Sequence, residues 1–101
     1  MVRHVILWQL KDELDSEKKE SVKAGIKAAL EALVGTVPGL REVHVQTAAL
    51  AGATADVMLD CLLDDEAALR GYAVHPAHVQ AADTYVRPFT KLRVCMDYEV
   101  R

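Results

Sequence analysis

Cysteine, aromatic residues and long apolar segments are all scarce in this chain of 101 residues. The two cysteines, Cys61 and Cys95, have no Cys-x-x-Cys spacing, so neither redox nor zinc chemistry is indicated. No apolar run approaches the roughly 18 residues of a membrane span, and the apolar start has no small-residue cleavage pattern after it. The net charge is −3 with no dense basic cluster. These absences predict a cytoplasmic protein with no membrane or nucleic-acid partner.

The length fits one domain over residues 1–101, because a chain of this size can bury one core but not two. Apolar and polar side chains alternate in four segments, and this period of two is typical of β-strands. The predicted strands are residues 2–10, 40–47, 56–63 and 91–99. Both cysteines fall within such strands, so we expect buried, inert thiols.

Helical spacing fills the intervals between these strands. Asp15 or Ser16 can cap a helix over 16–34, and Gly35 ends it. A Pro38–Gly39 turn follows. A second, broken helix runs from the Asp64–Asp65 cap to about residue 87. The resulting order β-α-β-β-α-β predicts a split βαβ, ferredoxin-like α+β fold, with a four-stranded antiparallel sheet and both helices on one face.

The other face of that sheet is predicted to be apolar. It would expose Val5, Leu7, Val94, Met96 and Tyr98, among others, to water. Monomers rarely expose an apolar patch of this extent, so a homodimer formed through the sheet face is expected. In this strand order Cys61 and Cys95 lie about 9–10 Å apart, which is too far for a disulfide.

The segment from Tyr72 to His78 is the best candidate for a functional site. His75 precedes the restarted helix, Pro76 takes its first position and His78 its third. Near the positive end of a helix the imidazolium is disfavoured, so His78 can act as a neutral base. The alternative is structural: His75 is a helix cap, His78 only anchors the helix, and Tyr72 is core packing.

Residues on the strands extend this site. If His4 and Trp8 face the helices, then Cys95 and Asp97 on the neighbouring strand point into the same cleft as Tyr72 and His78. An Asp97 carboxylate bonded to His78 would fix the tautomer of the imidazole. The alternative is a satisfied interior His4, a wall or core position for Trp8, and an Asp97 paired with an arginine.

A metal site is not expected. His75 and His78 are spaced i, i+3, but His75 lies before the helix, and no acidic residue in sequence completes a ligand set. The proton chemistry available to Tyr72 and His78 needs no cofactor.

Several motifs together resemble one family. They are the opening Val2–Asp12, the Pro38–Gly39 turn, Asp64–Leu69 leading to Tyr72, His75-Pro76-Ala77-His78, and the closing Asp97-Tyr98-Glu99-Val100. The chain is similar over nearly its whole length to the stress-responsive A/B barrel family of small dimeric α+β barrel proteins.

The resemblance implies the fold and a dimer whose two sheets face each other. Most members of the family have no known function, but some plant relatives are polyketide cyclases, whose tyrosine and histidine map to Tyr72 and His78, with His4 beside them. The cyclases line their pocket with aromatic residues from the first helix. This chain has Val22, Lys23 and Ile26 in that region.

Three functions remain open from the sequence. The leading hypothesis is a homodimer that binds a small apolar or aromatic carbonyl compound between helices and sheet, through His4, Trp8, His75, Cys95 and Asp97. The alternative is a cofactor-free cyclase or lyase, with His78 as base and Tyr72 as acid. The third is a structural stress protein without a ligand.

Overall fold

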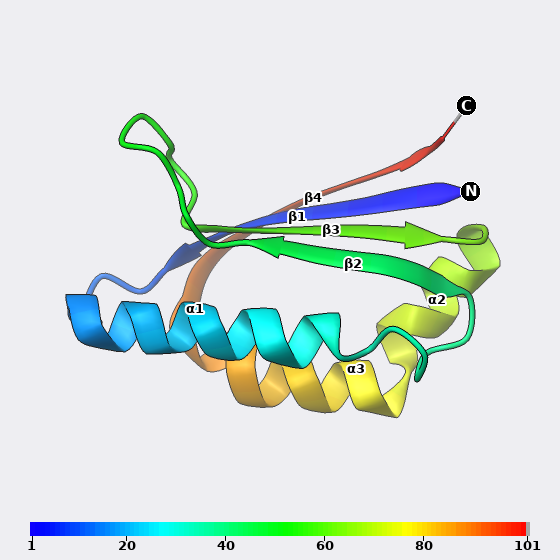
Figure 1. The fold of residues 1–101 in the computed structure, drawn as a ribbon, viewed down its shortest axis with the longest axis horizontal. Helices are drawn as coiled ribbons and strands as arrows, with labels where there is room; N and C mark the ends of the chain where they lie inside the picture. Colours follow the sequence, from blue (N-terminus) through cyan, green and yellow to red (C-terminus); the bar gives the residue numbers. More distant parts are fainter. Residues whose placement is uncertain (101) are drawn as a thin grey trace.

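The computed structural model describes residues 1–100, and it consists of one curved sheet with its helices on one face (Figure 1). The strands are ordered β2-β3-β1-β4 and are antiparallel throughout. This confirms the ferredoxin-like prediction, with the first and third strands central. The elements are β1 (Val2–Leu10), α1 (Ser16–Glu31), β2 (Leu40–Gln46), β3 (Val57–Leu63), α2 (Glu66–Val74), α3 (Pro76–Ala81) and β4 (Thr90–Glu99).

The strands follow the alternation in the sequence. Along β1, the side chains of Val2, His4, Ile6, Trp8 and Leu10 are buried against the helices, while the intervening residues are half-buried or exposed. In β3 the same alternation buries every second residue. Since successive side chains of a strand point to opposite faces, this register gives one sheet face to the core.

The helices begin at the predicted caps. The Asp15 carboxylate accepts the backbone N–H of Lys18 at the start of α1, and Asp65 does the same for Ala68 at the start of α2. The first helix ends at Glu31 rather than at residue 34. Residues 32–36 form turns instead, and Gly35 within them has a φ of 90°.

The predicted Pro38–Gly39 turn packs against α2, just before β2 begins. Gly39 has a φ of 80°, and a Cβ there would come within 2.7 Å of the Ala68 Cβ. Only glycine fits both the left-handed backbone and this contact. The turn therefore fixes the place at which α2, and after it Tyr72, meets the sheet.

The last helical segment changes its winding before β4. After α3 the chain continues as a π-helical turn over Ala82–Val86 and a 3₁₀ turn over Arg87–Phe89. The sequence predicted one helix to about residue 87, and the path is confirmed, but not the regular winding. π-turns widen a helix and are frequent at functional sites. This one brings Val86 and Arg87 to the edge of a pocket.

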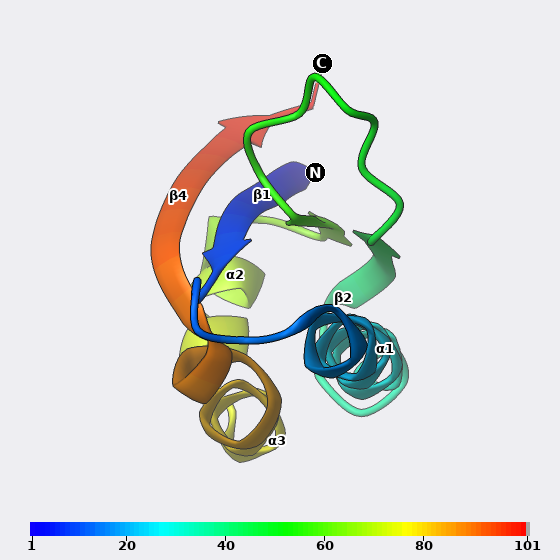
Figure 2. The same ribbon diagram turned by 90° about the vertical axis from the view of Figure 1, so that its left-hand side faces the viewer.

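The face of the sheet away from the helices is uncovered. Leu7, Leu92, Val94, Met96 and Tyr98 are exposed there, and the Arg3 guanidinium pairs with Asp60 at 3.1 Å on the same face. The connection between β2 and β3 rises on this side, away from the helices (Figures 1 and 2). Within the described residues, no helix is long and apolar enough to cross a membrane.

Candidate functional site

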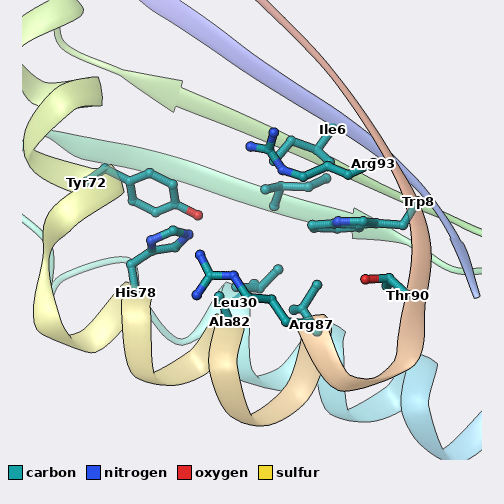
Figure 3. Close-up of a pocket in the computed structure, with 11 residues that line it drawn as sticks. Ile6, Trp8, Leu30, Tyr72, His78, Ala82, Arg87, Thr90 and Arg93 are labelled. Atoms are coloured by element: carbon teal, nitrogen blue, oxygen red, sulfur yellow. The ribbon is translucent and has the colours of Figure 1, made fainter.

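A pocket lies between the sheet and the helices, on the side of α3 (Figure 3). Ile6, Trp8 and Leu30 form an apolar wall. The inner space is about 80 Å³, and the whole hollow out to its open mouth is about 460 Å³. The polar side chains that reach it come from α2, α3, the turns after α3, and β4; they are Tyr72, His78, Arg87, Thr90 and Arg93. The hollow therefore combines an apolar wall with a few convergent polar groups, as ligand sites do.

Tyr72 brings an unpaired hydroxyl to this pocket. Its side chain is only 1% exposed, and within residues 1–100 no group makes a hydrogen bond of normal geometry with its oxygen; its polar neighbour is the Cys61 thiol, a weak hydrogen-bonding group. Burial, and then the neighbouring Cys61 thiol, raise the pKa of the Tyr72 hydroxyl well above its usual value, so the group stays protonated. In Figure 3 this hydroxyl points into the hollow. An unpaired buried O–H is costly unless a ligand accepts from it.

His78 lies directly against Tyr72, with the two ring centres 4.2 Å apart and the planes tilted by 39°. Its Nδ1 is 3.3 Å from the carbonyl oxygen of Ala73. A carbonyl can only accept, so we assign the proton to Nδ1, which leaves the Nε2 lone pair available. Burial lowers the pKa of His78, and the Arg87 and Arg93 charges add to this. The lowered pKa of His78 supports the predicted neutral imidazole, and burial is its largest cause.

The hydrogen bond between Asp97 and His78 that the sequence suggested is not formed, because Asp97 is bonded to His4 instead. The Asp97 carboxylate lies 2.5 Å from Nδ1 of His4, its partner in the β1–β4 register. The Cys95 sulfur lies 3.7 Å from the same nitrogen and 3.5 Å from the Asp97 oxygen. His4 in turn meets the edge of Tyr72, at 5.8 Å between ring centres. These three residues therefore form a cluster beside the pocket lining, in contact with Tyr72 through His4.

The expected burial of Cys95 is wrong. Cys61 is fully buried on the central strand β3, but Cys95 is exposed on the edge strand β4. Both thiols are free, as the strand spacing predicted. Burial raises the pKa of Cys61 to about 12, and partial burial followed by the Asp97 charge raises that of Cys95, so both stay protonated at neutral pH.

His75 is a helix cap. Its Nδ1 accepts the backbone N–H of Ala77 at 3.1 Å, with Pro76 at the first helical position. The ring is used by its own helix and does not line the pocket. His75 is therefore the helix cap that the structural interpretation predicted. Trp8, by contrast, is both buried and part of the pocket wall.

Two features of this region were not predicted from the sequence. The first is a possible metal-ligand set, because the ligand atoms of His4, Cys95 and Asp97 lie within 4.8 Å of one another. A zinc ion there would have to break the His4–Asp97 hydrogen bond, because metal-bound imidazole nitrogen carries no proton. The second omission is Arg87 and Arg93. Arg93 could have been found, since it shares the Cys95 and Asp97 face of β4.

The fold and the site together define a class: a small ferredoxin-like α+β protein with a pocket under one half of its sheet. Residues 2–100 match the model of the stress-responsive A/B barrel domain family, and the chain belongs to that family. No curated protein sequence matches it.

Three solved structures are similar over nearly the whole chain. A dimeric ferredoxin-like protein of unknown function from Bacteroides fragilis is 31% identical, with a TM-score of 0.91, covering 98% of this chain and 95% of that one. A dimeric ferredoxin-like protein of unknown function from Thermobifida fusca is 26% identical, with a TM-score of 0.79 and coverages of 98% and 90%. Hydroxynitrile lyase from Passiflora edulis is 16% identical, with a TM-score of 0.78 and coverages of 99% and 93%, and shares the fold alone.

Proposed function

We propose that this protein is a homodimer that binds a small apolar or aromatic carbonyl compound in the pocket under β1 and β4. The single observation that carries the proposal is the buried, unpaired Tyr72 hydroxyl beside His78. A carbonyl oxygen of the ligand would accept from Tyr72, and its apolar part would lie against Ile6 and Trp8. Such a ligand would satisfy the Tyr72 hydroxyl, which is unpaired among the described residues.

Acetophenone is a suitable probe, and Trp8 is a suitable reporter. The chain has a single tryptophan, so its indole N–H gives one resonance that needs no assignment. We expect acetophenone to shift that resonance in the parent, and Tyr72→Phe to weaken binding. Tyr85→Phe is the matched control, because Tyr85 is an exposed tyrosine outside this pocket. Equal affinity in the two variants would remove Tyr72 from the site.

The dimer is proposed to form through the uncovered face of the sheet. Its support is the exposed apolar surface of Leu7, Leu92, Val94 and Met96, together with the dimeric state of the Bacteroides and Thermobifida proteins. Two sheets facing each other would remove this surface from water, and a two-fold axis lets one patch cover its own copy.

Sedimentation tests the interface. The parent is expected to sediment as a dimer at micromolar concentration, and Met96→Lys to shift it toward monomer by placing a charge at the centre of the apolar face. Val74→Lys is the control, since Val74 is 75% exposed at the end of α2. A monomeric parent would contradict the proposal, and dissociation caused equally by both variants would move the interface elsewhere.

A cofactor-free lyase or cyclase is the second candidate, and the His78–Tyr72 contact favours it. The Nε2 of His78 would take a proton from the carbon next to the ligand carbonyl, and the electron pair of that C–H bond would move onto the carbonyl oxygen. Tyr72 would stabilise the resulting enolate by donating its O–H. Both atoms face the same hollow (Figure 3).

Deuterium exchange separates a binder from an enzyme. In D₂O, an active protein would replace the methyl protons of acetophenone, and NMR would follow their loss. His78→Gln should abolish this exchange while acetophenone still shifts the Trp8 resonance. Exchange that persists at the parent rate in the variant would remove His78 as the base. No exchange above the buffer rate in the parent would leave the protein a binder.

A further inference from the structure

Two arginines, Arg87 and Arg93, also line the pocket. Arg93 lies on β4 opposite Trp8, and Arg87 lies on the 3₁₀ turn at the end of the helical segment. In Figure 3 the Arg93 guanidinium lies on the sheet side of the hollow and that of Arg87 on the helix side. Both head groups lie toward the end of the pocket that holds Tyr72 and His78.

The charge of Arg93 is not neutralised by a neighbouring acid. Among residues 1–100, no carboxylate oxygen lies within 4.0 Å of its guanidinium, whereas Arg87 is paired with Asp83 one helical turn away. Asp97, on the same face of β4, is already bonded to His4. Arg93, exposed like the rest of β4 after Thr90, therefore presents to the pocket a guanidinium that has no ion-pair partner among the described residues.

That charge is felt by both proposed site groups. Arg87 and Arg93 contribute to the lowered pKa of His78, after burial. Arg93 opposes the burial that raises the pKa of Tyr72. A guanidinium in such a position binds a planar carboxylate through two parallel N–H groups, and it is more weakly hydrated than an ammonium.

We infer that the pocket takes an oxo acid, a small carbonyl compound that also carries a carboxylate, with the carboxylate on Arg93 and the carbonyl oxygen on Tyr72. This inference rests on the proposed function and narrows its ligand class. Arg87 also lines the pocket, but its charge is paired with Asp83, so the carboxylate is assigned to Arg93. The apolar wall of Ile6 and Trp8 then takes the remainder of the ligand.

Three aromatic probes separate the two groups of such a ligand. Benzoylformate has both a carbonyl and a carboxylate, acetophenone has a methyl group in place of that carboxylate, and benzoate lacks the ketone. We expect calorimetry to show benzoylformate binding roughly tenfold or more tighter than either partial probe, as a charged hydrogen bond allows. Inorganic phosphate, as the fourth probe, should bind weakly.

Variants then assign the effect to Arg93. Arg93→Gln should reduce benzoylformate affinity to the level of acetophenone and leave acetophenone affinity within about twofold, as expected where a charged contact is lost and the apolar contacts remain. Arg93→Lys should recover part of the affinity, because it keeps the charge but not the planar fork. Arg41→Gln removes the same charge from an exposed arginine outside this pocket and is the matched control.

Each contrary outcome has its own meaning. If acetophenone binds and benzoylformate binds no tighter, the oxo-acid inference fails while the proposed function stands. If none of the three aromatic probes binds, both fail. Phosphate or benzoate binding as tightly as benzoylformate would show a general anion site and overturn the inference. Equal losses in Arg93→Gln and Arg41→Gln would do the same, since a long-range charge effect would then suffice.

Discussion

The same helix-facing layer of this sheet is a closed core at one side and a candidate site at the other. Under α1, strands β2 and β3 bury Val43, Val45 and Leu63 against Ile26 and Leu33. Under α2 and α3, strands β1 and β4 present His4, Arg93, Cys95 and Asp97. Figure 2 shows α1 beneath β2, with α3 on the side of β4. We name these the core half and the site half.

The position of each strand explains the difference. β3 lies between β2 and β1 and is covered on its helix face, so each inward residue is apolar. β4 is an edge strand, and its residues from Lys91 onward are exposed in the chain. Polar groups there keep partners or water, and so avoid the cost that isolated polar groups meet in a core. The site half thus accepts charge that the core half could not.

The largest expected effect comes from breaking the core half. Leu63 is 0% exposed on the central strand β3, and Leu63→Ala should lower the free energy of unfolding by about 2–5 kcal/mol through lost burial and a cavity. Urea denaturation measures this. Leu50→Ala, at an 85% exposed loop position, is the control and should change little. A loss below about 1 kcal/mol would mean that this half is not close-packed.

Removing the His4–Asp97 hydrogen bond should have the next largest effect on stability. It tests whether the site half also stabilises the fold. Asp97→Ala leaves the Nδ1 of buried His4 without its partner and should cost about 1–3 kcal/mol in urea denaturation. Asp97→Asn retains an acceptor and should lose less. If the two variants unfold at the same urea concentration as the parent, the hydrogen bond contributes nothing to stability.

Tyr72→Phe should stabilise the protein, opposite in sign to the first two. The hydroxyl is buried without a partner, so its removal should raise the free energy of unfolding by about 1 kcal/mol while weakening carbonyl binding. Such an exchange of stability for function is expected at a site. Thermal unfolding without ligand measures it. Destabilisation by Tyr72→Phe would show that the hydroxyl is satisfied in the free protein.

The smallest effect is a pH dependence that belongs to His78. Its pKa is lowered by folding, so below about pH 6.5 the unfolded chain binds a proton that the folded chain does not. Stability should therefore fall as the pH drops from about 6.5, and His78→Gln should flatten this slope. The exposed His44→Gln is the control for loss of a histidine. A slope unchanged by His78→Gln would contradict the burial of this ring.

The core half could be predicted from sequence more fully than the site half. Alternation in residues 40–47 and 56–63 predicted the two strands of the core half, and Asp15 predicted the start of α1. His75 was correctly interpreted as a possible cap because capping is local. The predicted partner of Asp97, His78, was wrong because the contact depends on the cross-strand register. In that register Asp97 is paired with His4 on β1. The role of Arg87 depends on a π-turn that has no sequence signal here.

The pairing of β1 with β4 has a consequence for the order of folding. Val2 is aligned with Glu99, and His4 with Asp97, so the site half closes a loop of nearly the whole chain. Contacts so distant in sequence form late and slowly, whereas the β2–β3 hairpin and α1 are local. During synthesis, the core half can fold while β4 is still in the ribosome. The pocket would then be the last part of the protein to exist, and a chain cut before Thr90 would lack it.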